Sequence, residues 1–271
     1  MDADRETPTV LPAVLRRRQM GELIAARGFV RVVELSRTFG ISGVTVRSDL
    51  DALERMRLIL RVHGGAVPRQ TPPERETSFE ESLESSSAAK ERIGAAAAAL
   101  VRTGQSVLLD VGSTTLAVAR ALVARADLRD VTVVTNGLTI ALELEPAVPR
   151  FTVVVTGGTL RPLQHSLVDP LARPVLEQVH ADIAFIGCNG VDVERGVTNV
   201  NLPEAEIKRL MLGASARPVV VADSSKLGRV HLGAIGPLSE VDTVITDDGA
   251  AVARVEAIRA TGVEVIVAGR S

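Results

Sequence analysis

Seven runs of apolar, mostly β-branched residues recur from residue 106 onward, and they constrain the fold more than any other feature of the chain. They are residues 106–109, 131–134, 151–155, 182–186, 218–222, 241–245 and 263–267. Because their apolar character is continuous rather than alternating, the runs predict strands buried on both faces, as in a mainly parallel sheet between helices. Helical stretches between them, such as residues 115–124, fit that arrangement. We therefore expect an α/β domain over residues 78–271 that opens with a helix over residues 78–102.

The segments that follow five of these runs are small, polar and mostly glycine-containing. They are residues 110–115, 135–137, 156–159, 187–192 and 223–226. Parallel sheets bind ligands at the carboxyl ends of their strands, where glycine permits close approach and hydroxyls and helix amides hold phosphate oxygens. Each segment alone is also typical of a plain strand-to-helix turn. Together they favour a site for a hydroxylated, phosphorylated ligand.

A different pattern, Ile41–Glu54, predicts an amphipathic helix near the N-terminus. Ser42 is a suitable N-cap, and Val46, Leu50 and Leu53 form one narrow apolar stripe. The opposite face is small, polar or cationic: Val44, Ser48, Asp51 and Arg55, with Thr45 and Arg47 on its flanks. A helix that reads the DNA major groove needs slim side chains for base edges and Arg or Thr for phosphates. An ordinary surface helix would look similar, so the neighbouring segments must decide.

Those neighbours favour the DNA-reading interpretation. Residues 12–27 and 32–38 predict two further helices, and Gly40 supplies a tight turn into the third, which is helix-turn-helix spacing. Residues 58–67 then predict a two-stranded hairpin, or wing. Residues 12–69 hold eleven arginines against five acids, a local charge of +6 in a chain whose net charge is −2. A basic module on an acidic body indicates that the module binds a polyanion.

The arginine run that begins the first helix, Arg16 to Arg18, is either a phosphate contact or a solvated face, and we favour the solvated face. Residues 1–11 are expected to be a disordered tail. Residues 68–77 form a linker that Pro72 and Pro73 make semi-stiff. The winged helix-turn-helix domain then occupies residues 12–67.

Composition excludes several other classes of protein. The single cysteine, Cys188, rules out an internal disulfide framework, and the four scattered histidines have no metal-ligand spacing. The chain has neither a dinucleotide-binding nor a nucleoside-triphosphate-binding glycine motif, so we expect no cofactor. The acidic N-terminus lacks the apolar stretch of a signal peptide, which predicts cytoplasmic residence.

The N-terminal motifs resemble those of the DeoR family of bacterial transcriptional regulators. They are Gly28-Phe29-Val30, Glu34-Leu35, Phe39-Gly40-Ile41-Ser42, Thr45-Val46-Arg47, Asp49-Leu50, Leu53-Glu54 and Arg61-x-His63-Gly64-Gly65-Ala66. Ser48 departs from the family, which usually has a second basic residue there. The pattern and the resemblance together predict that operator DNA is bound by Arg31, Ser42, Val44, Thr45, Arg47, Ser48, Arg61 and His63.

The strand-end segments resemble the C-terminal sensor domain of the same family, a Rossmann-like domain similar to ribose-5-phosphate isomerase. The matching motifs include Asp110-x-Gly112-Ser113-Thr114-Thr115, Thr135-Asn136, Gly157-Gly158, Glu204-Ala205 with Lys208, and Asp223-Ser224-Ser225-Lys226. The resemblance implies a phosphorylated sugar or sugar alcohol as effector, with its phosphate on Gly112, Ser113 and Thr114. The full predicted set is Asp110, Gly112, Ser113, Thr114, Thr115, Asn136, Gly157, Gly158, Asp192, Glu204, Lys208 and Lys226. Asp169 departs from the family. It either adds a negative charge near the anion site or caps a helix beginning at Pro170, and we favour the cap.

Two functions remain open on the sequence alone. The first is a repressor of a carbohydrate catabolic operon, a homo-oligomeric dimer or tetramer whose operator binding is modulated by a phosphorylated sugar. The second is a sugar-phosphate isomerase with an accessory DNA-binding module, in which Asp192 or Glu204 is the base and Lys226 its electrostatic partner. The fused DNA-binding module argues against the enzyme, because an isomerase has no need of it.

Overall fold

The computed structural model describes residues 12–56, 58–62, 64–68 and 76–269, and the chain divides into two compact units, Met1–Arg75 and Glu76–Ser271. The expected tail 1–11, residues 69–75 of the expected linker, Arg57 and His63 lie outside the described residues. Glu76 and Thr77, which the sequence prediction places in the linker, belong to the second unit. Within the part of the chain described, no helix is both long and apolar enough to cross a membrane.

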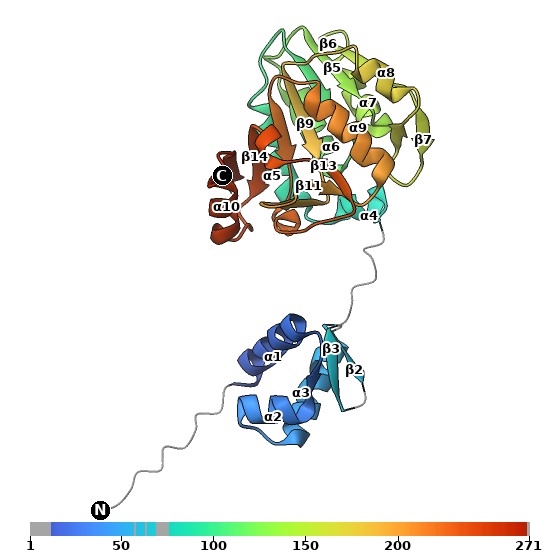
Figure 1. Cartoon of the computed structure of the whole chain (residues 1–271). Coiled ribbons are helices and arrows are strands. Elements are labelled where there is room, and N and C mark those ends of the chain that lie inside the picture. The colour runs from blue at the N-terminus through green and yellow to red at the C-terminus, as the bar shows by residue number, and fades with distance from the viewer. Residues whose placement is uncertain (1–11, 57, 63, 69–75, 270–271) are drawn as a thin grey trace, which may run out of the picture. The chain divides into compact units, whose positions relative to one another are not determined.

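The first unit is a winged helix (Figure 1). Its helices are α1 (Ala13–Arg27), α2 (Val32–Phe39) and α3 (Gly43–Arg55), and its wing is β2 (Ile59–Val62) with β3 (Gly65–Pro68). Gly40 ends α2 in the left-handed region, with φ of 62°, and so turns the chain into α3. All three helices and the hairpin are confirmed. A two-residue strand, β1 (Val30–Arg31), is added because Val30 pairs with Ala66 of β3.

The core of the first unit lies where the three helices meet the small sheet. Ten buried apolar residues form it: Met20, Ile24, Val30, Val32, Leu35, Val46, Leu50, Leu53, Ile59 and Ala66. The apolar stripe predicted for α3 is therefore the face that packs inward. The opposite face of α3 is left to solvent.

All seven predicted strands are present in the second unit, and they form one fully parallel sheet. They are β4 (Ser106–Leu109), β5 (Val131–Thr135), β6 (Phe151–Val155), β9 (Ile183–Gly187), β12 (Pro218–Val221), β14 (Thr243–Asp247) and β15 (Glu264–Ala268). Their order across the sheet is β15-β14-β12-β9-β4-β5-β6. The strands at the two edges, β6 and β15, are partly exposed, so the expectation of burial on both faces was wrong for them.

Helices cover both faces of this sheet (Figure 1). Successive side chains of a strand point to opposite faces, so Leu108 joins one core and its neighbours Val107 and Leu109 join the other. One face packs against α8 (Ala172–Leu176), α9 (Leu202–Gly213) and α10 (Val252–Arg259). The other packs against α5 (Ser87–Ala98), α6 (Ser113–Ala124) and α7 (Leu138–Leu144).

The single helix expected over residues 78–102 is in fact two, α4 (Phe79–Glu84) and α5. The break falls in the serine run 85–87, where Ser85 is extended and Ser86 is left-handed, with φ of 55°. Serine competes for the backbone with its own hydroxyl, so it favours such a break over a continuous helix. The ammonium of Lys90 binds the carbonyl oxygens of Ser82 and Ser85, which α4 leaves without helical partners.

Two smaller sheets complete the second unit, and the sequence did not predict them. One is the hairpin β7 (Thr159–Arg161) and β8 (Ser166–Val168); the other joins β10 (Gly190–Asp192), β11 (Gly196–Asn199) and β13 (Gly233–Gly236). Helix α8 begins at Ala172 and has no side-chain cap, so the interpretation of Asp169 as a helix cap was wrong. Asp169 lies before the helix and instead pairs with Arg173, a residue of its first turn, at 3.4 Å.

Candidate functional site

The helix α3 presents a slim, polar outer face. Ser42 is its N-cap, as predicted, and its hydroxyl accepts the backbone N–H of Thr45 at 3.2 Å. Val44 is 75% exposed, and Arg47 and Ser48 are also exposed. The residues predicted to approach DNA on this helix are thus on the surface and near its N-terminus.

Arg16 and Arg17 hold α1 to α3, and the solvated face predicted for them was wrong. The Nε–H of Arg16 donates to Asp49 Oδ2 at 2.7 Å, and that of Arg17 donates to Oδ1 at 2.8 Å. Both Arg16 and Asp49 are buried. Burial alone would raise the pKa of Asp49, but the hydrogen bonds and charges of the two arginines outweigh it and lower the pKa. Only Arg18, paired with Glu22 at 3.1 Å, matches the predicted solvated face.

The wing brings Arg61 to the exposed side of β2, where its guanidinium pairs with Asp51 of α3. The backbone N–H of Arg61 also donates to Glu54 Oε1, at 2.9 Å. The wing is therefore joined to the same helix whose outer face is described above. Arg31 is exposed at the start of α2, and its backbone N–H donates to Glu34 Oε2 at 3.0 Å.

In the second unit, the loops after β4, β9 and β12 converge on one cavity of about 160 Å³. These three strands are neighbours in the sheet, so their carboxyl ends lie together. Seven of the predicted effector residues line this cavity: Gly112, Ser113, Thr114, Thr115, Glu204, Lys208 and Lys226. Gly112 has φ of 142°, a conformation that L side chains rarely adopt, and it leads directly into α6.

Asn136, Gly157, Gly158 and Asp192 do not line the cavity. Asn136 joins two loops, since its Oδ1 accepts Val111 N–H at 3.1 Å and its Nδ2 donates to Leu167 O at 3.3 Å. A Cβ on Gly158 would lie 2.2 Å from the carbonyl oxygen of Val168, so this glycine permits the backbone of β8 to approach. Asp192 accepts the backbone N–H groups of Glu194 and Arg195. Asn136, Gly158 and Asp192 thus have structural contacts that the sequence pattern alone did not reveal.

A buried ion pair forms the floor of the cavity. The ammonium of Lys208 in α9 binds Asp110 Oδ2, which also accepts the N–H of Gly187 at 3.0 Å. Burial raises the pKa of Asp110 to about 6, against the opposing charge of Lys208. Burial also disfavours the ammonium, but the charges of Asp110 and Glu204 outweigh it and raise the pKa of Lys208. Of the two, only Lys208 reaches the cavity wall.

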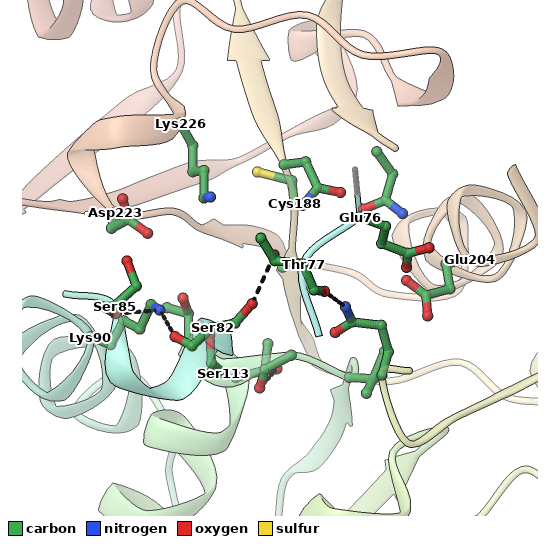
Figure 2. Close-up of a pocket in the computed structure, with 18 of the residues that line it drawn as sticks. Glu76, Thr77, Ser82, Ser85, Lys90, Ser113, Cys188, Glu204, Asp223 and Lys226 are labelled. Carbon is green, nitrogen blue, oxygen red and sulfur yellow. Dashed lines mark hydrogen bonds between the residues drawn. The ribbon is translucent and has the colours of Figure 1, made fainter. Parts of the chain in front are cut away.

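The segment before α5 supplies a wall that the sequence prediction missed. It contributes Glu76, Thr77, Glu81, Ser82 and Ser85, and Lys90 of α5 joins them. Figure 2 shows Lys90, Ser85, Asp223 and Lys226 toward one end of the cavity, and Glu76 with Glu204 toward the other. Lys90 is 6% exposed, and burial lowers its pKa. The serine run 85–87 was the available signal that a helix end, with its unpaired carbonyls, lay here.

Cys188 also lines the cavity, at the end of β9. Burial raises the pKa of its thiol to about 12, and the side chain packs against the core on the α9 face. A thiol with so high a pKa is a poor nucleophile. Cys188 therefore acts here as a small apolar side chain.

Both units match family descriptions. Residues 16–71 match the DeoR-like helix-turn-helix domain, and residues 85–248 match the DeoR C-terminal sensor domain. The chain belongs to the DeoR family. It is 38% identical to the HTH-type transcriptional regulator GlpR of Haloferax volcanii. The 259 matched residues cover 95% of this chain and 98% of that protein. It is 35% identical to the regulator GolR of Listeria innocua, over 86% of this chain and 90% of that protein.

The glycerol-3-phosphate regulon repressor of Escherichia coli K12 is 31% identical, over 83% of this chain and 87% of that protein. This DeoR-family chain is therefore a DNA-binding transcriptional regulator, and not an enzyme. Among solved structures, ribose 5-phosphate isomerase A of Methanocaldococcus jannaschii overlaps 51% of this chain and 52% of its own, with 20% identity and a TM-score of 0.37. That likeness is too slight to bear on function.

Proposed function

We propose that this regulator represses a carbohydrate catabolic operon and releases its operator when a phosphorylated sugar occupies the cavity of the sensor domain. One observation carries the proposal. The amide-rich start of α6 and the ammonium of Lys226 line the same cavity, in a chain whose other unit presents a DNA-reading helix. The named relatives, among them a glycerol-3-phosphate regulon repressor, support it.

The phosphate would bind at the N-terminus of α6. This helix has twelve residues and no side chain caps its first amides, so those N–H groups are available to an anion. The hydroxyls of Ser113 and Thr114 line the cavity beside them. The lysine ammonium of Lys226 adds a positive charge. A Cβ on Gly112 would lie 3.3 Å from the hydroxyl oxygen of Thr115, so glycine keeps this tight turn free of side-chain atoms.

The hydroxyls of the sugar would bind the polar groups on the remaining walls. Carboxylates accept from sugar hydroxyls, and Glu204 and Asp223 line the cavity. The side-chain amides of Asn189 and Asn199 both donate and accept. Asp110 lies beneath this surface and would act through Lys208 rather than by touching the ligand. Asn136, Gly157, Gly158 and Asp192 would shape the loops around the site.

Operator DNA would be read by the outer face of α3 in the major groove. Val44 and Ser48 would face base edges, while Arg47, Thr45 and Arg61 would hold phosphates. Arg31 and the N-cap residue Ser42 would lie beside the backbone of the duplex. We further propose that the protein is a dimer or tetramer, because two winged helices would then occupy repeated half-sites.

A carboxylate introduced at Ser113 tests the phosphate site. The operator fragment is first selected from random DNA with the full chain, and its binding is followed by fluorescence anisotropy during titration with hexose, pentose and glycerol monophosphates. We expect one of these ligands to weaken operator binding. Ser113→Glu should raise the concentration needed by about 10- to 100-fold, because hydrogen bonds to a charged phosphate are replaced by repulsion.

The matched control is Ser87→Glu, which adds the same charge at an exposed position on α5. It should respond like the unaltered protein. If a phosphosugar binds the full chain, by calorimetry, yet leaves operator binding unchanged, the proposed function is wrong. If the two variants need the same ligand concentration to release the operator, the phosphate does not bind at the N-terminus of α6.

A further inference from the structure

The three residues that open the second unit, Glu76 to Ser78, lie along the β7–β8 hairpin, and we call them the anchor segment. The side chain of Gln164 donates to Thr77 O at 2.5 Å. Immediately after the segment, Phe79 is 2% exposed and its N–H donates to Leu163 O at 2.9 Å. Phe79 is therefore fixed by burial. The anchor segment before it is held by polar contacts.

Arg161 supplies the strongest of those contacts. Its Nη2 donates to Glu76 Oε2 at 2.8 Å and its Nη1 to Glu76 Oε1 at 3.2 Å, which is a bidentate fork. The same guanidinium pairs with Glu204 of α9, whose carboxylate also accepts the hydroxyl of Ser166 at 2.6 Å. Glu204 is deeply buried, whereas the side chain of Glu76 keeps 17% of its exposure.

Glu76 and Glu204 also line the cavity at the ends of β4, β9 and β12, in which we propose that the effector binds. Figure 2 shows Glu76 beside Glu204 there, with Thr77 projecting between the two ends. A ligand in this cavity therefore meets the carboxylate that holds the start of the second unit. Because Glu76 directly follows the first unit in the chain, a change at Glu76 acts on the connection between the units.

We propose that Arg161 is a positioning residue through which the cavity controls the DNA-binding unit. This inference rests on the proposed function. Arg161 does not itself line the cavity, but both of its carboxylate partners do. When Glu76 leaves, oxygen atoms of the effector take the N–H groups that Arg161 gave to it, since the guanidinium fork fits sugar and phosphate oxygens as well as a carboxylate. Glu204 stays on Arg161 because it is the more deeply buried partner. Glu76 then returns to water and Thr77 comes away with it, while Ser78 stays in place as the N-cap of α4, held by its capping box with Glu81.

Release of Glu76 and Thr77 lengthens the connection to the first unit. The two freed residues add at most about 7 Å of reach, at about 3.3–3.6 Å per residue. In an oligomer, a longer connection lowers the effective concentration of the second winged helix at its half-site. Operator affinity then falls when the effector binds. The ligand and the Glu76–Arg161 contact are alternatives, so each weakens the other.

Glu76→Gln in the full chain tests this inference, with Glu84→Gln as the matched control. The control removes the same charge from an exposed position at the end of α4. The ligand is the monophosphate from the hexose, pentose and glycerol panel that raises the melting temperature most. Its dissociation constant is measured by calorimetry, and operator binding by anisotropy with and without it.

In the unaltered protein, the ligand should weaken operator binding by about 5- to 150-fold, the usual range for coupled sites. Glu76→Gln should bind operator more weakly without ligand, and the ligand should change that binding less than about twofold. By reciprocity, Glu76→Gln should bind the ligand more tightly than the unaltered protein does. A merely structural defect would weaken ligand binding instead. Glu84→Gln should match the unaltered protein throughout.

Two results separate this inference from the proposed function. If no phosphosugar affects operator binding in the unaltered protein, the proposed function fails, and the inference fails with it. If the ligand releases operator from Glu76→Gln as fully as from the unaltered protein, or binds the variant no more tightly, only the inference is overturned.

Discussion

Two buried aspartates, one in each unit, are bound to cationic side chains of a helix, yet their pKa values shift in opposite directions. Burial raises both, but at Asp49 the hydrogen bonds of Arg16 and Arg17 outweigh burial and the pKa falls below 3.8. At Asp110, which is fully buried opposite the single ammonium of Lys208, burial prevails and the pKa rises to about 6. The directions differ because two guanidinium groups bind Asp49, whereas Asp110 is more strongly desolvated, has one ammonium as partner and lies near the negative charge of Glu204.

The difference also distinguishes what each pair can do. A guanidinium does not lose its proton in proteins, so the Asp49 cluster stays charged at all ordinary pH values. A carboxylate with a pKa of about 6 becomes neutral under mildly acidic conditions. The first pair is a fixed joint between α1 and α3. The second pair lies beneath a cavity that we propose binds an anion, and its charge changes with pH because Asp110 can take up a proton.

The largest effect should come from Asp49→Asn, which removes the carboxylate that accepts from the buried, charged guanidinium of Arg16. Breaking a buried pair in this way costs about 3–5 kcal/mol. Hydrogen exchange of the α3 amides in the full chain would show the loss, and operator binding should fall with it. Glu22→Gln, which breaks the exposed pair with Arg18, should cost under about 1 kcal/mol. Equal losses of stability in the two variants would contradict the special role of the buried Asp49 pair.

Lys208→Met should destabilise the second unit less, by about 2–3 kcal/mol at neutral pH. The reason is that Asp110, left without its ammonium, can take up a proton, whereas Arg16 cannot lose one. The cost of Lys208→Met should therefore shrink on going from neutral pH to about pH 5. Urea unfolding at the two pH values measures it. A cost that grows in acid would contradict the assignment of Asp110 as the group that titrates.

The pH dependence of the unaltered protein should differ between the units. Asp110 binds its proton more tightly when folded than when unfolded, so between its unfolded pKa of 3.8 and about 6 the second unit should lose stability as pH rises. The change is on the order of 1–3 kcal/mol, at 1.36 kcal/mol for each pKa unit. Comparing Asp110→Asn with the unaltered protein isolates it.

Asp49 contributes in the opposite sense, because its folded pKa is lowered. Its stabilisation is present above the unfolded pKa of 3.8 and disappears as pH falls through the lower, folded value. The protection factors of the α3 amides, which are corrected for the intrinsic pH dependence of exchange, should therefore stay constant where the second unit is changing. Parallel pH profiles of the two units would refute the contrast.

The smallest effect on stability should come from Arg47→Ala, an arginine that is exposed rather than built into the fold. It should leave unfolding within about 0.5 kcal/mol. It should weaken binding to all DNA sequences and reduce the salt slope of that binding by about one. Ser48→Arg should instead change which operator is preferred in a selection from random DNA. An unchanged operator preference would show that Ser48 does not contact the base edges.

Local sequence patterns were enough to predict the winged helix and the seven strands of the sheet. Ser42 as N-cap, the stripe of Val46, Leu50 and Leu53, and each continuous apolar run are features of neighbouring residues. Capping, periodicity and burial act within a few residues, so the sequence expresses them directly. The helix break at Ser85 and Ser86 was missed because helix propensity and turn chemistry compete there.

Only the tertiary structure decided which distant residues meet. The strand order places the ends of β4, β9 and β12 together, which gathers Ser113, Lys208 and Lys226 and leaves Asn136 and Asp192 in other roles. Arg161 meets Glu76 across 85 residues, and Arg16 meets Asp49 across 33. Such contacts depend on how elements pack and not on spacing along the chain. The sequence by itself determined the winged helix, the seven strands of the parallel sheet and the family of this regulator, while packing decided the wall of its cavity and the charge beneath it.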